Sequence, residues 1–458
     1  MAKNLIGPGG RLYADPAPGP DEVKFMEDNN SSAYYNSPYY AAHKNEVQPI
    51  PPRHGTAPMD LKDYAPAEVM DAITKAGKVI FHAVGDTGAA KVTRSQTAAT
   101  AIGHEAAVAD AMVADIQNED VDGPAFFFHL GDVIYNFGEA QYYYDQFYEP
   151  FRAYDRPIFA IPGNHDGMVF GKTSTAPQVP TLAAFLANFC ATKLGPSPDS
   201  GSLMRSVMTQ PGVYFTLDAP FVSIIGLYSN VLDSGAGVIS SQNHHFPTIT
   251  DDQLTFLKTE LARLKPDREA HKRAVILAVH HPAVSADAKH GGSTGMSADL
   301  DACCKAAGLW PDVVLSGHAH LYQRFTRTMN GRAIPYIVSG SGGYAATMPK
   351  PLKAGTTVGD STLVVAPIVK FGYLTITTDA KTLSMSFKTA DGQGVVVADS
   401  LTLDLAAGKI TSKTPAAAPS TATSGAKSSS KKGSPAKKAT TAKKAKKATK
   451  AKKAKSRR

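Results

Sequence analysis

Five short apolar runs, each followed at once by a polar turn, constrain the fold of this chain more than any other feature. They read KVIFHAVGDTG, AFFFHLGDVIY, PIFAIPGNHD, AVILAVHHP and DVVLSGHAH, and they lie between residues 78 and 320. Apolar runs of this length predict strands that are buried on both faces, as in sheets that helices cover. Helical patterns at residues 97–117 and 251–264 alternate with these runs, so an α/β or α+β architecture is expected.

The chain divides into three parts of different composition. Residues 1–76 show no sustained period of 2 or 3.6, and we expect an irregular N-terminal extension packed on the body. Residues 77–405 are expected to form one folded domain. Later runs predict antiparallel strands that complete a sheet, at residues 334–343, 371–378, 382–389 and 395–403. The second helix is expected to have Thr250 as its N-cap and to end before Pro266.

The third part, residues 406–458, is a tail rich in Lys and Ala. Residues 409–458 contain 17 of the 48 Lys and Arg residues and no Asp or Glu, which leaves 31 basic against 40 acidic residues elsewhere. Such a segment cannot bury enough apolar surface to offset its ordering entropy, so we expect disorder. Its charge favours an arm that binds a polyanion such as DNA, RNA or polyphosphate. A solubilising extension is the alternative.

The sequence also indicates the cellular compartment in which we expect the protein. No stretch approaches the ~20 consecutive apolar residues that span a bilayer, and the N-terminus lacks the pattern of a secretory signal. The three cysteines, Cys190, Cys303 and Cys304, do not form a disulfide framework. We therefore expect a cytoplasmic protein without membrane contact; nothing in the sequence specifies its oligomeric state.

The turns after the apolar runs carry carboxylate, amide, phenol and imidazole groups, which are ligands for hard or borderline metal ions. The ends of neighbouring strands form the mouth of a sheet, where ligands bind. The candidate ligands are Asp86, Asp132, Tyr135, Asn164, His280, His318 and His320. They exceed the about four to six positions of one ion, so two metal ions are expected, with Asp132 able to bridge them. Turn chemistry, or packing for Tyr135, is the alternative.

These motifs resemble those of the calcineurin-like metallophosphoesterases, and most closely those of purple acid phosphatases. GDTG, GDVIY, GNHD, the first His of AVHHP and GHAH appear in the family's order, over roughly residues 78–345. Many other branches have Asp-x-His at the first motif, whereas this chain has Gly88 there and Tyr135 three residues after Asp132. The resemblance implies an α+β fold, a four-layer α-β-β-α sandwich of two mixed β-sheets flanked by helices.

The resemblance also implies roles for the candidate ligands. Asp86, Tyr135 and His320 would bind Fe(III), and Asp132 would bridge it to a second ion. That second ion, divalent Fe, Zn or Mn, would be bound by Asn164, His280 and His318. His165 would contact the phosphoryl group. His290 opens HGGST ten residues after His280, and a similarly placed histidine of the family contacts phosphate and is a candidate general acid.

We therefore expect a dinuclear-metal phosphoesterase that hydrolyses phosphate monoesters of small molecules by in-line attack of a metal-bound hydroxide. Activity on diesters is the closest alternative. A second alternative, from another class, is a protein that binds nucleic acid or polyphosphate through its basic tail and uses the folded domain as a scaffold.

Overall fold

The computed structural model describes residues 5–6, 12–13, 49–88, 98–117, 123–135, 138, 140–167, 182–229, 237–243, 249–392 and 394–412. The tail beyond residue 412 and most of residues 1–48 lie outside these ranges, so the predicted disorder of the tail stays a prediction. Apart from a two-stranded pair, β1 (Leu5–Ile6) with β2 (Leu12–Tyr13), the described strands form two large sheets.

Both large sheets mix parallel and antiparallel pairs. The nine-stranded sheet has the order β13 (Thr357–Val358), β14 (Ser361–Leu363), β11 (Tyr322–Met329), β12 (Arg332–Ser339), β10 (Val313–Ser316), β9 (Ala274–Val279), β8 (Val222–Leu227), β7 (Phe215–Ala219) and β3 (Met59–Asp60). The seven-stranded sheet has the order β18 (Lys409–Ser412), β17 (Val395–Asp404), β16 (Thr382–Ala390), β15 (Gly372–Thr378), β4 (Val79–Val84), β5 (Phe127–His129) and β6 (Ile158–Ala160).

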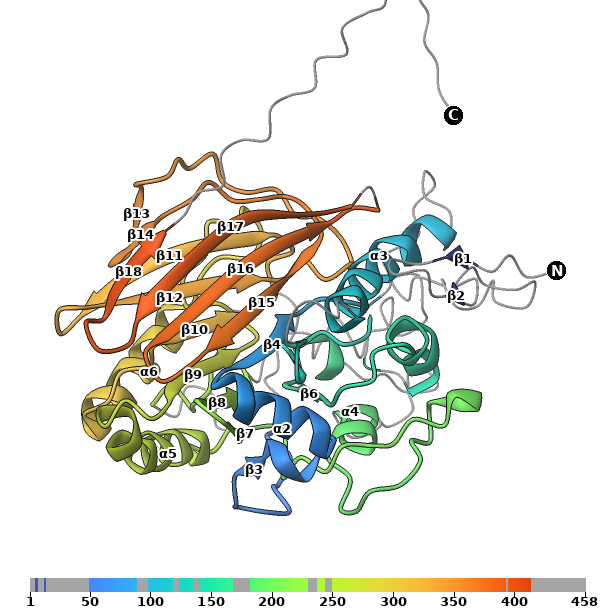
Figure 1. The fold of residues 1–458 in the computed structure, drawn as a ribbon. Coiled ribbons are helices and arrows are strands. Elements are labelled where there is room, and N and C mark those ends of the chain that lie inside the picture. The colour runs from blue at the N-terminus through green and yellow to red at the C-terminus, as the bar shows by residue number, and fades with distance from the viewer. Residues whose placement is uncertain are drawn as a thin grey trace, which may run out of the picture. The chain divides into compact units, whose positions relative to one another are not determined.

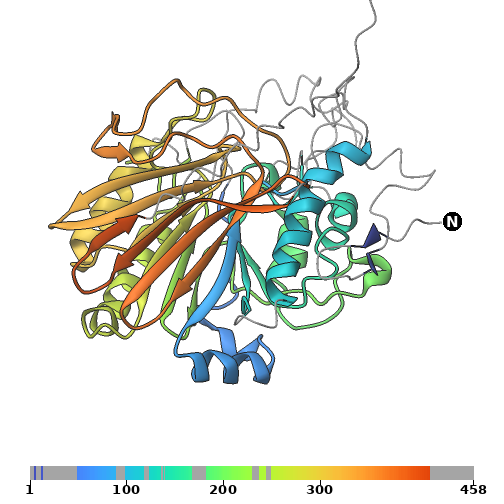
Figure 2. The ribbon, with the colours of Figure 1, turned by 45° about the horizontal axis from the view of Figure 1, so that its top comes forward.

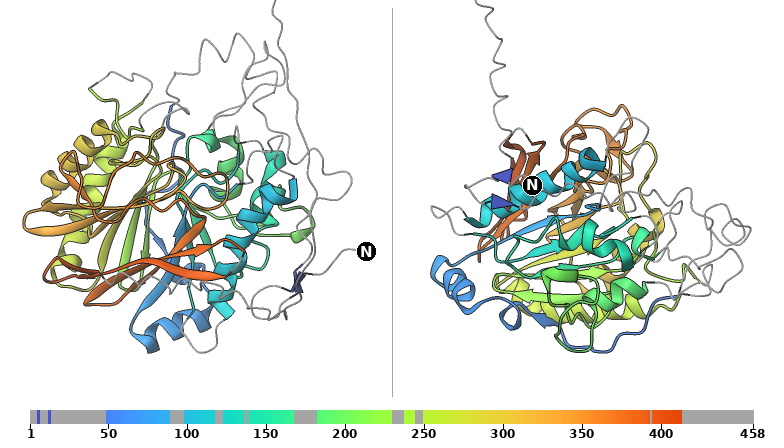
Figure 3. Two further views of the ribbon diagram at one scale, coloured as in Figure 1. Left: turned by 90° about the horizontal axis from the view of Figure 1, so that it is seen from above. Right: turned by 90° about the vertical axis from the view of Figure 1, so that its right-hand side faces the viewer.

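Helices cover the outer faces of the two sheets (Figures 1 and 2). The α-helices are α2 (Ala67–Ala76), α3 (Ala98–Gln117), α4 (Ala183–Phe189), α5 (Asp252–Glu269) and α6 (Thr294–Ala307). Short 3-10 or π turns are η4 (Leu61–Asp63), η5 (Ala140–Tyr142), η6 (Tyr144–Tyr148), η7 (His165–Gly167) and η8 (Gly201–Leu203). The left view of Figure 3 shows the sheets stacked, with α5 and α6 beyond the nine-stranded sheet and α3 beyond the other.

Three buried apolar clusters explain these layers. One lies between the sheets and joins, for example, Phe81 and Leu374 to Ile276. A second packs α3, through Met112, on the seven-stranded sheet, and a third packs α5 and α6 on the nine-stranded sheet, through residues such as Leu261. The predicted four-layer sandwich is thus confirmed. All three cysteines are free and buried, which agrees with the absence of a disulfide framework.

Several local predictions were wrong. Helix α2 occupies residues 67–76, within the segment expected to be irregular, and it buries Val69 and Ile73 in the core between the sheets. Strand β18 pairs with β17, so the sheet continues past residue 405. Strand β12 is antiparallel to β11 but parallel to β10, and it belongs to the nine-stranded sheet rather than the sheet formed by the later runs.

Helix α5 also differs from its prediction, because it begins after Asp251 rather than Thr250 and continues through Pro266 to Glu269. A tertiary contact accounts for the extra turn. Arg268 donates to both oxygens of Asp312, at 2.7 and 2.6 Å, and to the Leu405 carbonyl oxygen at 2.6 Å. These charge-assisted bonds anchor the last turn despite the proline, whose own preference opposes a helix interior.

A buried ion pair links the two sheets. Arg324 on β11 donates from Nε to Asp399 Oδ2 at 2.7 Å and from Nη2 to Asp399 Oδ1 at 2.9 Å, and Asp399 lies on β17. Tyr322 donates to the same carboxylate at 2.7 Å. The register of β16 with β17 shifts between Phe387 and Lys388, next to Asp399. This irregularity lies where β17 turns the Asp399 side chain into the core.

No helix in the described ranges is both long and apolar enough to cross a membrane.

Asp399→Asn is expected to lower the free energy of unfolding by about 3–5 kcal/mol, because the buried Arg324 guanidinium loses its counter-ion. Denaturant unfolding followed by circular dichroism measures the change. As a control, Asp391→Asn disrupts the exposed pair with Lys370 and should cost at most about 1 kcal/mol. Equal costs for the two variants would contradict a structural role for the inter-sheet pair.

Candidate metal centre

The strand ends bring the predicted site residues to one place. Strands β4, β5 and β6 are parallel neighbours in one sheet, and β9 and β10 are parallel neighbours in the other. The candidate ligands leave the carboxyl ends of these strands, or lie in the turns that follow: Asp86 after β4, Asp132 and Tyr135 after β5, Asn164 after β6, His280 after β9, and His318 and His320 after β10. Both sheets therefore contribute to one site.

One group of donor atoms comprises Asp86 Oδ1, Tyr135 Oη and His320 Nε2. The phenol oxygen lies 3.1 Å from Asp86 Oδ1 and 3.5 Å from His320 Nε2, and that nitrogen lies 3.3 Å from Asp86 Oδ1. Two donors bound at ~2.1 Å to one ion and at right angles lie about 3 Å apart. The spacing of these three atoms therefore fits a shared metal ion.

A second group comprises Asn164 Oδ1, His280 Nε2 and His318 Nδ1. The amide oxygen lies 3.1 Å from His280 Nε2 and 3.0 Å from His318 Nδ1. Asn164 comes from the seven-stranded sheet and the two imidazoles come from the nine-stranded sheet. The spacing again fits three ligands of a single ion.

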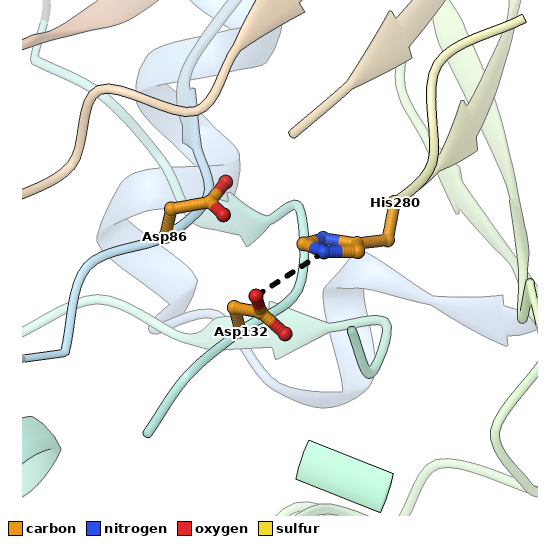
Figure 4. A group of neighbouring side chains, drawn as sticks. All are labelled: Asp86, Asp132 and His280. Carbon is orange, nitrogen blue, oxygen red and sulfur yellow. Dashed lines mark ion pairs between the residues drawn. The ribbon is translucent and has the colours of Figure 1, made fainter. Parts of the chain in front are cut away.

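Asp132 lies between the two groups. Its Oδ2 is 3.0 Å from Tyr135 Oη in the first group and 3.3 Å from His280 Nε2 in the second. Figure 4 shows Asp86 and Asp132 with His280, whose ligand atoms all lie within 4.8 Å of one another. Asp132 is 1% exposed. A single buried carboxylate is thus within reach of both groups, as a bridging ligand must be.

The hydrogen bonding of His280 tests whether these residues fit a cation. His280 Nδ1 lies 2.9 Å from the Leu130 carbonyl oxygen and must be the N–H donor, because that oxygen only accepts. In the neutral ring Nε2 then carries a lone pair, which points toward Asn164 Oδ1 and Asp132 Oδ2. Acceptors that converge in a buried place repel one another unless a proton or metal ion lies between them. The donor set therefore fits a metal centre.

Burial alone would lower the pKa of His280, but Asp132 and Asp86 outweigh burial and raise that pKa to about 9, so without a metal ion a proton on Nε2 lies between the acceptors. Burial alone would raise the pKa of Asp132, but His280 and His165 outweigh it and hold that pKa below its usual range. Burial, and then Asp132 and Asp86, raise the pKa of Tyr135 well above its usual range. The phenol therefore keeps its proton unless a strong Lewis acid displaces it. Burial and the neighbouring imidazoles lower the pKa of His318, which leaves it neutral as a ligand must be.

The two candidate catalytic histidines lie beside the donor groups. The backbone N–H of His165 donates to Asp132 Oδ1 at 2.9 Å, and its ring lies 4.5 Å from the Tyr135 ring between centroids. The His290 ring lies 4.3 Å from that of His318 and 5.5 Å from that of His320. Both side chains are thus placed near the candidate metal positions.

Three candidate ligands have strained backbones. Asp86, Asp132 and His318 have φ values of 57°, 53° and 67°, in the left-handed region that residues other than glycine rarely adopt. Gly163 leaves space for one of them, because a Cβ there would lie 2.1 Å from Asp132 Oδ1. Strain of this kind costs of order 1–3 kcal/mol per residue and is typical of functional sites.

Two supporting side chains were missed by the sequence interpretation. His129 accepts from Gly131 N at Nδ1, at 3.1 Å, so its Nε2–H donates to Thr87 Oγ1 at 2.9 Å. This ring ties the turn of Asp86 to the turn of Asp132. Asp166 accepts from Gly163 N at 2.8 Å and from Val133 N at 3.1 Å, which fixes two turns together. Asp166 belongs to the GNHD motif, which was the available signal for its role. Nothing in the sequence around His129 indicates a supporting role.

Comparison with known proteins identifies a family. The model of the calcineurin-like phosphoesterases matches residues 81–322, which is more than half of the chain. This range contains every candidate ligand and both candidate catalytic histidines. No curated protein sequence matches the chain.

The chain also matches solved structures, among them the following three. Purple acid phosphatase PPD1 from yellow lupin (Lupinus luteus) seeds has 17% identity and a TM-score of 0.47, over 71% of this chain and 54% of that protein. GAP50, the anchor in the inner membrane complex of Plasmodium, has 14% identity and a TM-score of 0.42, over 71% and 88%. PhoD has 12% identity and a TM-score of 0.46, over 79% and 73%. The chain thus spans about half the lupin protein.

Removing bound metal with a chelator is expected to lower the thermal unfolding temperature, and restoring Zn²⁺ or Mn²⁺ is expected to raise it again. An ion that binds only the folded state at 100 times its Kd adds about 2.7 kcal/mol. Asp132→Ala should abolish the response, whereas Asp391→Asn, far from the donors in sequence and partly exposed, should keep it. An unfolding temperature of the wild type that does not respond to metal would contradict a metal centre.

Proposed function

Because the chain belongs to the calcineurin-like phosphoesterase family, we propose that it is a dinuclear-metal hydrolase of phosphate monoesters, of the purple acid phosphatase type. The observation that carries the proposal is the division of the donors into two groups of three on either side of Asp132 Oδ2. Tyr135 in the first group supports the purple acid phosphatase type, because a phenol replaces the imidazole that many other branches place in the first motif.

In this proposal Asp86, Tyr135 and His320 hold Fe(III), and Asn164, His280 and His318 hold a divalent ion, Fe, Zn or Mn, with Asp132 bridging. Such ions, when bound, neutralise charge on the phosphoryl oxygens and lower the pKa of a coordinated water. The hard carboxylate and phenol oxygens of the first group suit a trivalent ion, whereas the two imidazoles of the second suit a borderline divalent ion.

The chain's own residues then position the substrate. Asp132 Oδ1 holds the His165 backbone, and the His165 ring beside Tyr135 is placed to contact a phosphoryl oxygen. His290, packed against His318, is the candidate to contact phosphate or to protonate the leaving alkoxide. The His290 backbone N–H donates to Asp287 Oδ1 at 2.6 Å, so its loop is held in place without substrate. Substrates are expected to be phosphorylated small molecules.

The purified protein is expected to cleave 4-nitrophenyl phosphate and to contain two metal ions per chain, one of them iron, with a visible charge-transfer band. Asp132→Ala should lower kcat/KM at least about 10³-fold, because both ions lose a shared ligand. Tyr135→Phe should abolish the band, because only a phenolate gives it. Elemental analysis, absorption spectra and steady-state kinetics measure these outcomes.

Two results would contradict this proposal at different levels. Full activity of Asp132→Ala would contradict the two-metal site. An active, colourless protein with two zinc or manganese ions would contradict only the purple acid phosphatase type, and would leave a broader metallophosphoesterase. Comparing 4-nitrophenyl phosphate with bis(4-nitrophenyl) phosphate tests the alternative of a phosphodiesterase.

The basic tail supports a second role that is compatible with the first. Its 17 basic residues without any acidic one favour binding to DNA, RNA or polyphosphate through phosphate contacts. A scaffold without activity is less well supported, because the described residues supply every candidate ligand.

Full-length protein is expected to bind double-stranded DNA with an affinity that falls steeply with salt, with a log–log slope of about −0.9 per phosphate contact. A variant truncated after Ser412 keeps strand β18 and should lose this binding while it retains phosphatase activity. Filter binding at several salt concentrations measures the slope. Equal DNA affinity of the two proteins would contradict a role for the tail.

A further inference from the structure

The Tyr135 ring stacks face to face on the ring of Tyr344. Their centroids are 3.5 Å apart and their planes differ by 4°. Ring planes in contact are themselves about 3.5 Å apart, so the two phenols overlap with almost no offset. Two neutral, electron-rich rings disfavour such a sandwich and prefer an offset or edge-on contact. An arrangement this close therefore requires that the surrounding structure hold both rings in place.

Backbone contacts fix the position of Tyr344. Its N–H donates to the Asp86 carbonyl oxygen at 3.1 Å, and Gly342 N donates to the Gly85 carbonyl oxygen at 3.1 Å. The intervening Gly343 has φ +150°, and a Cβ there would lie 2.6 Å from the Glu105 Cα on α3. The segment is thus pressed between the turn of Asp86 and a helix, with a glycine at the tightest point. Tyr344 is therefore placed relative to Asp86 by the main chain.

The other sides of Tyr135 are constrained as well. Gln146 accepts from Tyr135 N at 2.8 Å and donates to Tyr135 O at 3.0 Å, which fixes the backbone. A Cβ at Gly88 would lie 2.8 Å from Tyr135 Cδ2, so the absence of a side chain at residue 88 makes room for the ring. With Tyr344 on one face, these contacts restrict the phenol ring, whose oxygen lies 3.1 Å from Asp86 Oδ1 and 3.0 Å from Asp132 Oδ2.

We propose that Tyr344 is a positioning residue that holds the Tyr135 phenol in the orientation needed to bind the first metal ion. The inference rests on the proposed function, because it takes Tyr135 as a ligand. A ring held in this orientation favours metal binding, and by linkage a bound metal ion favours the orientation and the stack. Stacking and metal binding therefore support each other: loss of the Tyr344 ring weakens the hold on metal, and metal strengthens the stack.

The test compares Tyr344→Leu, which removes the aromatic face, with Tyr344→Phe, which keeps it. Tyr373→Phe, on β15, is a control for the loss of a tyrosine hydroxyl away from the candidate ligands. The holoprotein is dialysed against a chelator, and metal content is followed with time beside the visible spectrum. Circular dichroism melts of the metal-free proteins check that each variant folds.

Tyr344→Leu is expected to lose metal about 3- to 10-fold faster than wild type, the range that corresponds to an aromatic pair, and to shift the charge-transfer band. Tyr344→Phe and Tyr373→Phe should behave like wild type. Metal loss and a spectrum of Tyr344→Leu equal to those of wild type would overturn the proposal, as would equal losses in the Leu and Phe variants.

The same measurements separate this inference from the proposed function. If wild type holds two metals without a visible band, the ferric assignment fails, while faster metal loss from Tyr344→Leu still supports the positioning role. If Tyr135→Phe holds metal as firmly as wild type while Asp132→Ala does not, Tyr135 is no ligand. The positioning role is then overturned, although the metal centre stands.

Discussion

The Asp132 carboxylate is the interaction on which both halves of the candidate site depend. It leaves the seven-stranded sheet, and its Oδ2 lies within 3.3 Å of a phenol from its own turn and of an imidazole from the other sheet. Its Oδ1 holds the backbone of His165. A donor atom displaced by 1 Å no longer shares an ion with its neighbours, so the two sheets must keep one fixed relative position.

The core explains how that position is kept. Apolar side chains between the sheets give most of the adhesion, but packed apolar faces tolerate small shifts against each other. The Arg324–Asp399 pair adds a directional link between β11 and β17. If either strand slipped by one residue, its side chain of the pair would face outward and the link would be lost. The ion pair and the candidate metal centre thus lie at different places in the sandwich, and each joins residues from the same two sheets.

The sequence predicted which polar residues lie together better than it predicted the local elements around them, for a physical reason. A strand end carries a local signal, which is an apolar run followed by polar residues such as Asp, Asn or His. The motifs of this kind contain all the candidate ligands. Helix α5 passed Pro266 because Arg268 finds Asp312 across the structure, and β18 formed because it pairs with β17. Helix α2 formed within a segment of weak pattern because its apolar face enters the core. Such contacts are distant in sequence and leave no local signal.

The supporting residues were hidden for the same reason, and Tyr344 shows it most clearly. Tyr344 ends the glycine-rich segment IVSGSGGY, residues 337–344, and no motif in the sequence marks it. Its role depends on Gly343 fitting against α3 and on Gly88 leaving space for the Tyr135 ring. The donor group that contains Tyr135 is therefore a matter of volume as well as chemistry. A side chain at residue 88 and the Tyr135 ring compete for one space, and a chain can place only one of them there.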